Sequence, residues 1–174
     1  MSLSYSKLIQ DLKDASISDT PYQWFGFTLG LVARGVDPGA RDFLSLCSMI
    51  LNDNEPLPGN TVAALTNIAL DCQRNLKNKS SQETLLVFPD SKVSKNERLK
   101  VLSDLAYGLR LGLSADGQNG ILHKIEDPDL LDGLHTLSAI SDVDPNEDLA
   151  EDDLSEVLTY IYNLVLNSYK KSHS

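Results

Sequence analysis

Two pairs of glycines, each pair four residues apart, lie inside segments whose apolar residues recur at helical spacing: Gly26 with Gly30, and Gly108 with Gly112. Residues four apart share one face of a helix, so each segment carries a notch on one side. An interior glycine costs a helix about 0.5–1 kcal/mol relative to alanine, and close packing against the notch is the natural compensation. We therefore predict that the two notched helices cross closely at the centre of the fold. The alternative is that a different bulky side chain fills each notch.

The rest of the chain follows the same helical pattern. Apolar residues repeat three and four apart in Leu99–Leu113 and again in Leu154–Val165, which indicates amphipathic helices. We expect helices over residues 4–14, 21–34, 38–51, 60–77, 95–113, 128–140 and 147–170. The β-like run Glu83–Asp90 has no second strand to pair with and is expected to form an extended loop on the core. The predicted fold is all-α, a single-domain bundle of about seven helices over residues 1–174.

Four of the expected helix starts carry an N-cap residue followed by proline, which is tolerated at the first helical position. They are Thr20-Pro21, Asp37-Pro38, Asp127-Pro128 and Asp144-Pro145. Ser94 with Glu97 adds a capping box, in which a serine oxygen accepts from the main chain three residues on.

The negative charge of the chain is concentrated in one segment. The net charge is −10, yet Glu126–Glu156 holds twelve carboxylates and no Lys or Arg, against thirteen acids and fifteen bases elsewhere. Such a segment repels nucleic acid and membrane surfaces and attracts basic proteins or cations. The candidate interaction face is Asp142, Asp144, Glu147, Asp148, Glu151, Asp152, Asp153 and Glu156. Residues 74–100 carry seven basic side chains against three acidic ones, and they are expected either to be solvated or to dock on this segment in the same or a neighbouring subunit.

Within the acidic segment, Asp142, Asp144, Asn146 and Asp148 have the spacing of oxygen ligands in a calcium loop. The match is superficial, because Glu147 stands where the sharp turn of such a loop needs glycine. We favour a solvated helix entry, with these four residues as weak calcium candidates.

Catalytic signatures are missing from the sequence. His123, His135 and His173 lie far apart, and none belongs to a metalloprotease or nucleophile-elbow motif. His135, in a leucine-rich stretch, is interpreted as a partly buried structural histidine. Cys47 and Cys72 lack the spacing of a disulfide framework or a zinc knuckle and are expected to be reduced core residues. We therefore expect neither catalysis nor a metal or other cofactor.

Two segments carry a resemblance to a known family. Trp24–Gly35, WFGFTLGLVARG, resembles the first signature of the bacterial YgfB/YecA-like family, and Leu102–Leu113, LSDLAYGLRLGL, resembles its second. The leucine-rich helix, acidic run and closing helix of Glu126–Tyr169 are similar to the family's remaining part. The resemblance covers most of the chain and implies an all-helical domain without established enzymatic activity.

The departures from that family indicate what the resemblance preserves. The histidine, serine and cysteine usual in its first signature align with Phe25, Leu29 and Ala33, so any chemistry they perform in relatives is lost here. Some members carry a cysteine-rich zinc-binding tail, which this sequence lacks after Ser174, so no zinc is implied. The structural signature that remains is Gly26, Gly30, Gly35, Gly108 and Gly112.

These observations favour a non-enzymatic cytoplasmic bacterial protein with a regulatory role. It is expected to bind an unidentified basic protein through its acidic face or through a groove beside the glycine-notched helices. The polar start of the chain and its short apolar stretches argue against secretion and a membrane span, and complementary charged patches make a homodimer plausible. One alternative is a helix-turn-helix DNA-binding regulator around Gly35-Val36-Asp37 with Arg41 on the second helix. Another is a small enzyme whose site assembles from scattered residues such as Asp132 and His135.

Overall fold

The computed structural model describes Gln10, Asp14 and residues 21–115 and 125–173. This described part contains seven α-helices and no strand, and it confirms the predicted all-α class. The helices are α2 (Pro21–Ala33), α3 (Arg41–Leu51), α4 (Gly59–Lys77), α5 (Gln82–Leu85), α6 (Lys95–Ser114), α7 (Pro128–Ser141) and α8 (Glu151–Ser172). The helix predicted over residues 4–14 and the Thr20 cap lie outside the described residues, apart from Gln10 and Asp14.

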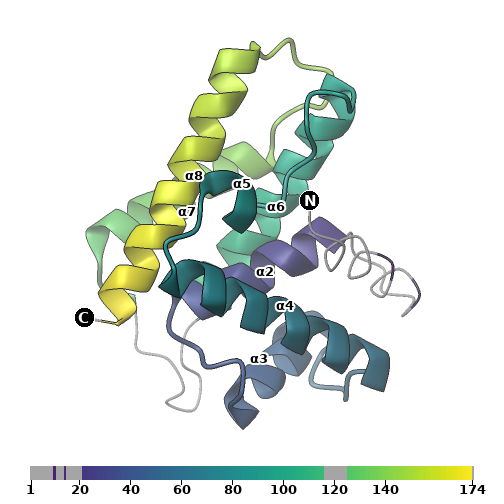
Figure 1. Ribbon diagram of the computed structural model, residues 1–174, viewed down its shortest axis with the longest axis vertical. Coiled ribbons are helices and arrows are strands. Elements are labelled where there is room, and N and C mark those ends of the chain that lie inside the picture. The colour runs from purple at the N-terminus through teal and green to yellow at the C-terminus, as the bar shows by residue number, and fades with distance from the viewer. Residues whose placement is uncertain (1–9, 11–13, 15–20, 116–124, 174) are drawn as a thin grey trace.

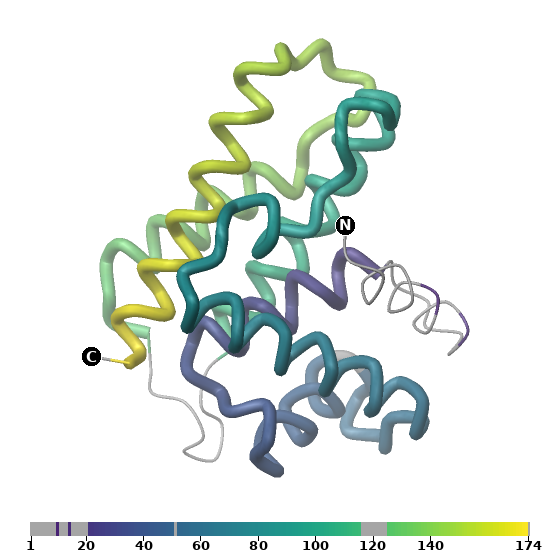
Figure 2. The backbone as a smooth tube through the Cα atoms, viewed as in Figure 1, coloured from purple at the N-terminus to yellow at the C-terminus, as the bar shows by residue number. Residues whose placement is uncertain are grey.

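Helix α2 is the central element of the fold (Figure 1). All ten residues from Trp24 to Ala33 are buried, as expected of a helix that is covered on every side. It packs against α6, α4 and α8, while α7 packs on α6. Figure 2 shows α8 running along one side of the molecule toward the C-terminal end of α2, where the Ser172 hydroxyl donates to the Ala33 carbonyl at 2.8 Å.

The two glycine-notched helices pack directly against each other, as predicted. A Cβ at Gly26 would lie 2.5 Å from the Leu105 carbonyl oxygen, and one at Gly30 would lie 2.8 Å from the Leu113 nitrogen. In the opposite direction, a Cβ at Gly108 would overlap the Gln23 carbonyl oxygen. Main chain, rather than a bulky side chain, occupies each notch, so the alternative of two independently filled notches is wrong.

Polar side chains fix the crossing at both ends. Gln23, near the start of α2, donates from Nε2 to Asp104 Oδ1 at 3.0 Å. Arg34, just after α2, donates from Nη1 to the carbonyls of Leu113 and Ala115 at the end of α6. Because residue numbers rise together along both helices, α2 and α6 run in the same sense. Arg34 also supplies hydrogen bonds to carbonyls that the end of α6 leaves without helical partners.

Gly35 ends α2 in the left-handed region, with φ = +93°. Its N–H donates to the Val32 carbonyl, and the N–H of Val36 donates to the Leu31 carbonyl. These two bonds form a Schellman motif, in which glycine is favoured at this position because a side chain would strain the backbone.

Of the four predicted helix starts within the described residues, two are confirmed and two are wrong. Asp127 caps α7 by accepting from Asp129 N at 3.0 Å, and Ser94 caps α6 by accepting from Glu97 N at 3.2 Å. Asp37-Pro38 instead forms a turn before α3, which begins at Arg41. Asp144-Pro145 likewise forms a turn, and α8 begins only at Glu151.

The segment predicted as an extended loop begins instead with the single helical turn of α5, Gln82–Leu85. Leu85 and Leu86 are buried, Leu86 has extended backbone angles, and no regular secondary structure follows it up to Asp90. Cys47 and Cys72 are free and buried, as expected. No described helix is long and apolar enough to cross a bilayer.

Candidate functional site

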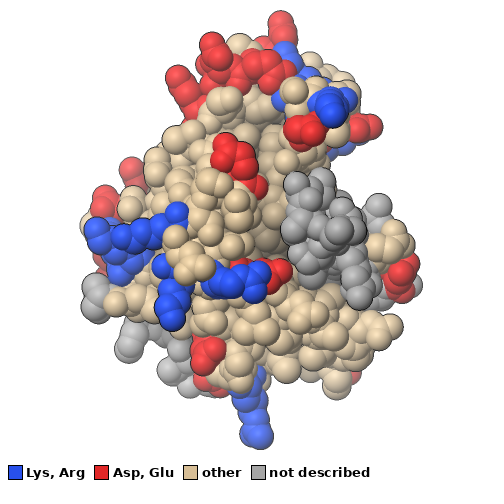
Figure 3. Space-filling view, in the orientation of Figure 1, with Lys and Arg blue, Asp and Glu red and all other residues tan. Residues whose placement is uncertain are grey.

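The acidic residues predicted as an interaction face gather at one end of the molecule. In Figure 3, acidic side chains cluster over the N-terminal end of α8 and the segment that precedes it. All eight are exposed: Asp142, Asp144, Glu147, Asp148, Glu151, Asp152, Asp153 and Glu156. Three of them lie in the first turn of α8, where the positive end of the helix dipole favours carboxylates. We call this set the acidic end.

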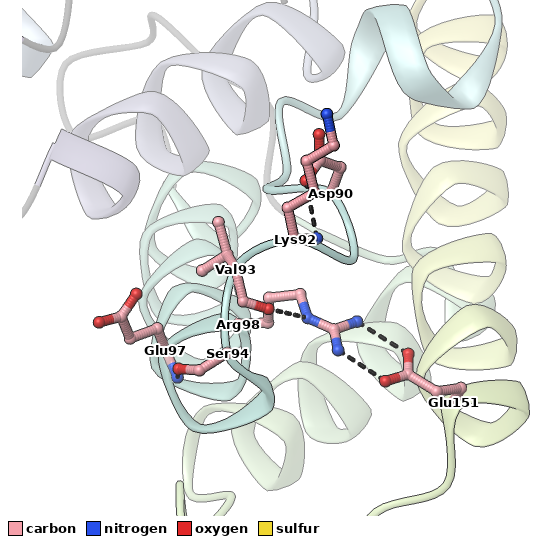
Figure 4. Close-up of polar contacts among 7 residues, drawn as sticks. All are labelled: Asp90, Lys92, Val93, Ser94, Glu97, Arg98 and Glu151. Atoms are coloured by element: carbon pink, nitrogen blue, oxygen red, sulfur yellow. Dashed lines mark hydrogen bonds and ion pairs between the residues drawn. The ribbon is translucent and has the colours of Figure 1, made fainter.

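One member of the acidic end, Glu151, forms an ion pair within the chain. Arg98 of α6 binds Glu151 of α8 through two hydrogen bonds of 2.8 and 2.6 Å, and its Nε donates to the Val93 carbonyl at 3.1 Å (Figure 4). The Arg98 side chain is only 8% exposed, whereas that of Glu151 is 56% exposed. Donation from Arg98 lowers the pKa of Glu151, and the bond to Glu151 raises the pKa of Arg98.

This bridge changes the role predicted for Glu151. Its two oxygens face a buried cation of the same chain, so it is a structural contact rather than a free part of the face. The bridge also realises, at one residue, the predicted docking of the basic region 74–100 on the acidic segment.

The proposed calcium ligands are partly used by the main chain and by α6. Asp144 accepts from Asn146 N at 2.9 Å, and Asn96 of α6 donates to Asn146 Oδ1 at 3.1 Å and to the Pro145 carbonyl at 2.9 Å. These bonds hold the turn against the start of α6. No group of three or more His, Cys, Asp or Glu side chains in the described residues is arranged to hold a metal ion.

The other seven carboxylates of the acidic end have no ion-pair partner among the described residues. Elsewhere in the acidic segment, Lys171 near the end of α8 binds Asp127 and Asp129 at 2.7 and 3.1 Å. Donation from Lys171 lowers the pKa of Asp127. Apart from the Arg98–Glu151 bridge, ion pairs between the acidic segment and described residues are found only at the start of α7, so the other seven carboxylates of the acidic end keep their negative field.

A groove of about 590 Å³ opens between α8 and the extended segment after α5. Leu86, Val87, Phe88 and Leu158 supply apolar lining, and Glu83 and Asp90 supply carboxylates. The two walls are joined by the Tyr162 hydroxyl, which donates to the Ser80 carbonyl at 2.7 Å, and by Thr159, which donates to Gln82 Oε1 at 3.1 Å. No sequence motif indicated this groove, because it exists only where α8 lies against residues 82–90.

The fold has a solved counterpart. The chain is similar to the lpg0076 protein of Legionella pneumophila, whose crystal structure it matches with a TM-score of 0.67 and 18% sequence identity. The match covers 95% of this chain and 93% of the Legionella protein, so the likeness extends over the whole fold. At that identity it is a likeness of fold alone. No family model and no curated protein matches the chain.

The residues proposed for the enzyme alternative lie on the surface of α7. Asp132 and His135 are both exposed on α7, so the interpretation of His135 as partly buried is wrong. The His173 ring lies 4.0 Å from that of Tyr169 at the far end of α8, and His123 is outside the described residues.

Burial raises the pKa of the Cys47 thiol to about 12 and also raises that of Cys72. Neither thiol is in the ionised form that nucleophilic catalysis requires.

The helix-turn-helix alternative depends on α3 reading DNA. Phe43 and Leu46 of α3 are buried in the core, and Leu44 is half-buried. Arg41 and Asp42 are exposed at the start of the helix, where their charges oppose each other. This surface lacks the positive charge that phosphate contacts need.

Proposed function

We propose that this protein is a non-enzymatic, cytoplasmic interaction protein that binds a basic partner protein through its acidic end and acts as a regulator. The observation that carries the proposal is the set of seven exposed carboxylates at one end of the fold, beside a groove with an apolar lining. A concentrated field of one sign steers an oppositely charged partner and favours it over others.

The family proposal rests on a different observation. Four of the five signature glycines lie in the crossing of α2 and α6, and Gly35 ends α2 in the left-handed region. The main-chain contact between α2 and α6 requires the glycines but not the polar residues beside them. The signature can therefore keep this packing role although Phe25, Leu29 and Ala33 replace the polar residues usual in the family. We propose membership of the YgfB/YecA-like family on this ground.

The alternatives have less support from the contacts described above. In the described residues, the buried thiols and the exposed His135 and His173 offer no assembled catalytic group, and α3 directs apolar residues into the core. A homodimer through complementary patches also loses support, since the buried Arg98 already binds Glu151 of its own chain.

The test is capture of partners from extracts of the cells that make the protein. Asp142→Lys, Glu147→Lys and Asp148→Lys, combined in one variant, reverse charge in the loop of the acidic end without touching the Arg98–Glu151 bridge. We expect wild type to retain a basic protein that this variant loses and that about 0.5 M salt elutes. A matched control reverses Glu55, Glu126 and Asp132 to lysine; these residues lie outside the acidic end, are exposed and have no ion-pair partner among the described residues. A partner retained equally by both variants would refute the proposal.

A further inference from the structure

The segment that follows α5 is extended at Leu86 and has main-chain groups without a hydrogen-bond partner among the described residues. Leu86 has extended backbone angles, φ −94° and ψ 100°, and its N–H bonds back to the Gln82 carbonyl. Beyond it, no hydrogen bond within the described residues involves the main chain of Val87 or Phe88. Main-chain groups are strong donors and acceptors, and an extended stretch with free groups is an open edge for strand pairing.

This open edge lies in the groove rather than on a flat surface. Val87 and Phe88 are half-buried and line it together with Leu158 of α8. Strand addition uses this arrangement, because main-chain bonds give affinity and pockets for alternate side chains give specificity.

The charged residues that line the groove are of one sign. Its lining contains Glu83 and Asp90 and no Lys or Arg. On α8, Asp152 and Glu156 lie within one turn of the lining residue Ser155, and both are exposed without an ion-pair partner in the described part. An occupant with apolar side chains toward the groove and basic side chains toward its rim would satisfy both features.

We infer that the groove binds an extended segment of the partner, in which Lys or Arg alternates with apolar residues, as a strand added to Val87–Phe88. The inference rests on the proposed function and names the contact through which it operates. Pro89 has no N–H, so the added strand is short. In the bound state the apolar side chains cover Leu158, and the basic ones face Glu83 and Asp152.

A defined probe tests the inference. The probe is a six-residue peptide of alternating lysine and valine with blocked ends, titrated into the full chain at about 50 mM salt while amide signals are followed by NMR. We expect the largest shifts at Val87 and Phe88, together with slower hydrogen exchange at both amides. A peptide with glutamate in place of lysine should not bind, since its charge matches that of the rim.

Two N-methylated probes isolate the strand pairing. One carries N-methyl groups on its three valines and the other on its three lysines, so that each blocks one edge of an extended strand. We expect one of them to bind at least tenfold more weakly than the unmodified probe. If both bind like the unmodified probe, strand addition is wrong.

Charge variants locate the probe in the groove. Glu83→Lys should weaken binding at least about threefold, as expected for reversal of a partly solvated charge, and Asp132→Lys on α7 should leave binding unchanged. Binding that instead shifts signals only in Asp142–Asp148 would overturn the groove assignment and leave the proposed function standing. Absence of any binding by the probe would overturn the inference as well, whereas the capture experiment tests the proposed function separately.

Discussion

Gly108 is the residue at which one added methyl group is expected to do most damage, because its Cβ would overlap the Gln23 carbonyl oxygen. Since backbone cannot move aside as a side chain can, Gly108→Ala should lower the free energy of unfolding by at least about 2 kcal/mol. Denaturant unfolding measures it. Gly59→Ala is the control, because nothing lies within 4 Å of a Cβ there. Equal effects of the two substitutions would contradict the observed crossing.

Gly35 makes a separate prediction, which concerns backbone conformation first, although a Cβ there would also lie 3.3 Å from the Ser172 Cβ. At φ = +93° an L-residue is strained, so Gly35→Ala should cost about 1–2 kcal/mol of stability. Gly35→Asn should cost less, because asparagine tolerates the left-handed region better than alanine. Thermal unfolding of both variants checks the order, and a more stable alanine variant would speak against the Schellman motif.

At the scale of single residues, the glycine crossing could be predicted from the sequence. A glycine inside a helix lowers its stability, and close packing of a second helix against the glycine is the usual compensation. The sequence did not predict the partner of Arg98. That pairing depends on where α8 begins. The predicted helix starts at residue 147, whereas α8 starts at Glu151, and the carboxylate of this first residue binds the buried guanidinium.

The Arg98–Glu151 bridge joins the starts of α6 and α8, and its contribution depends on pH. Because the pKa of Glu151 is lowered in the folded state, its stabilisation is fully present above the carboxyl pKa of the unfolded chain, near about 4.3. It is lost as the pH falls through the lower folded pKa. Melting temperatures from about pH 7 to pH 3 should therefore fall less steeply for Glu151→Gln than for wild type.

The matched control for that measurement is Asp152→Asn, the adjacent exposed acid without an ion pair among the described residues. It should preserve the acid sensitivity of wild type. Glu151→Gln should also start from a lower melting temperature at neutral pH, because it leaves the buried Arg98 without its charged partner. An unchanged pH profile would show that the bridge is not a source of acid sensitivity.

At the scale of elements, helix interiors were more predictable than helix starts. Asp37, Asp127 and Asp144 each accept a hydrogen bond from the N–H two residues on. The same bond leads directly into a helix only at Asp127. There, Leu130 and Leu137 provide buried contacts from the first turn onward, whereas exposed Asn146 and Glu147 follow Asp144. The hydrogen bond at the aspartate is the same in a turn and at a helix start, so it does not predict which of the two follows. Burial of the apolar side chains that come next separates Asp127 from Asp144.

For the whole molecule, the uncompensated charge of the acidic end predicts a dependence of stability on salt. The seven carboxylates repel one another, and salt screens repulsion between exposed charges. Melting temperature should therefore rise between about 10 and 200 mM salt. The increase should shrink in a variant with Asp142→Asn, Glu147→Gln and Asp148→Asn. An equal increase in wild type and variant would place the dominant repulsion elsewhere.

The charge asymmetry of the molecule was readable from the sequence, because composition alone locates the acidic segment. The groove was not, because its walls come from residues 82–90 and from α8, which are distant in the chain. The run Leu85–Phe88 looked β-like without a partner strand; in the structure Leu85 ends α5, Leu86 is extended, and Val87 and Phe88 line the groove without regular structure.

The crossing of α2 and α6 also bears on how the protein is made. Gln23 and Asp104, which meet at one end of the crossing, are 81 positions apart, so during synthesis this contact can form only after the intervening chain has been made. On the ribosome, the apolar surface of α2 emerges well before α6 can cover it. During that interval the nascent chain exposes Trp24 and Phe27, the kind of surface that chaperones bind.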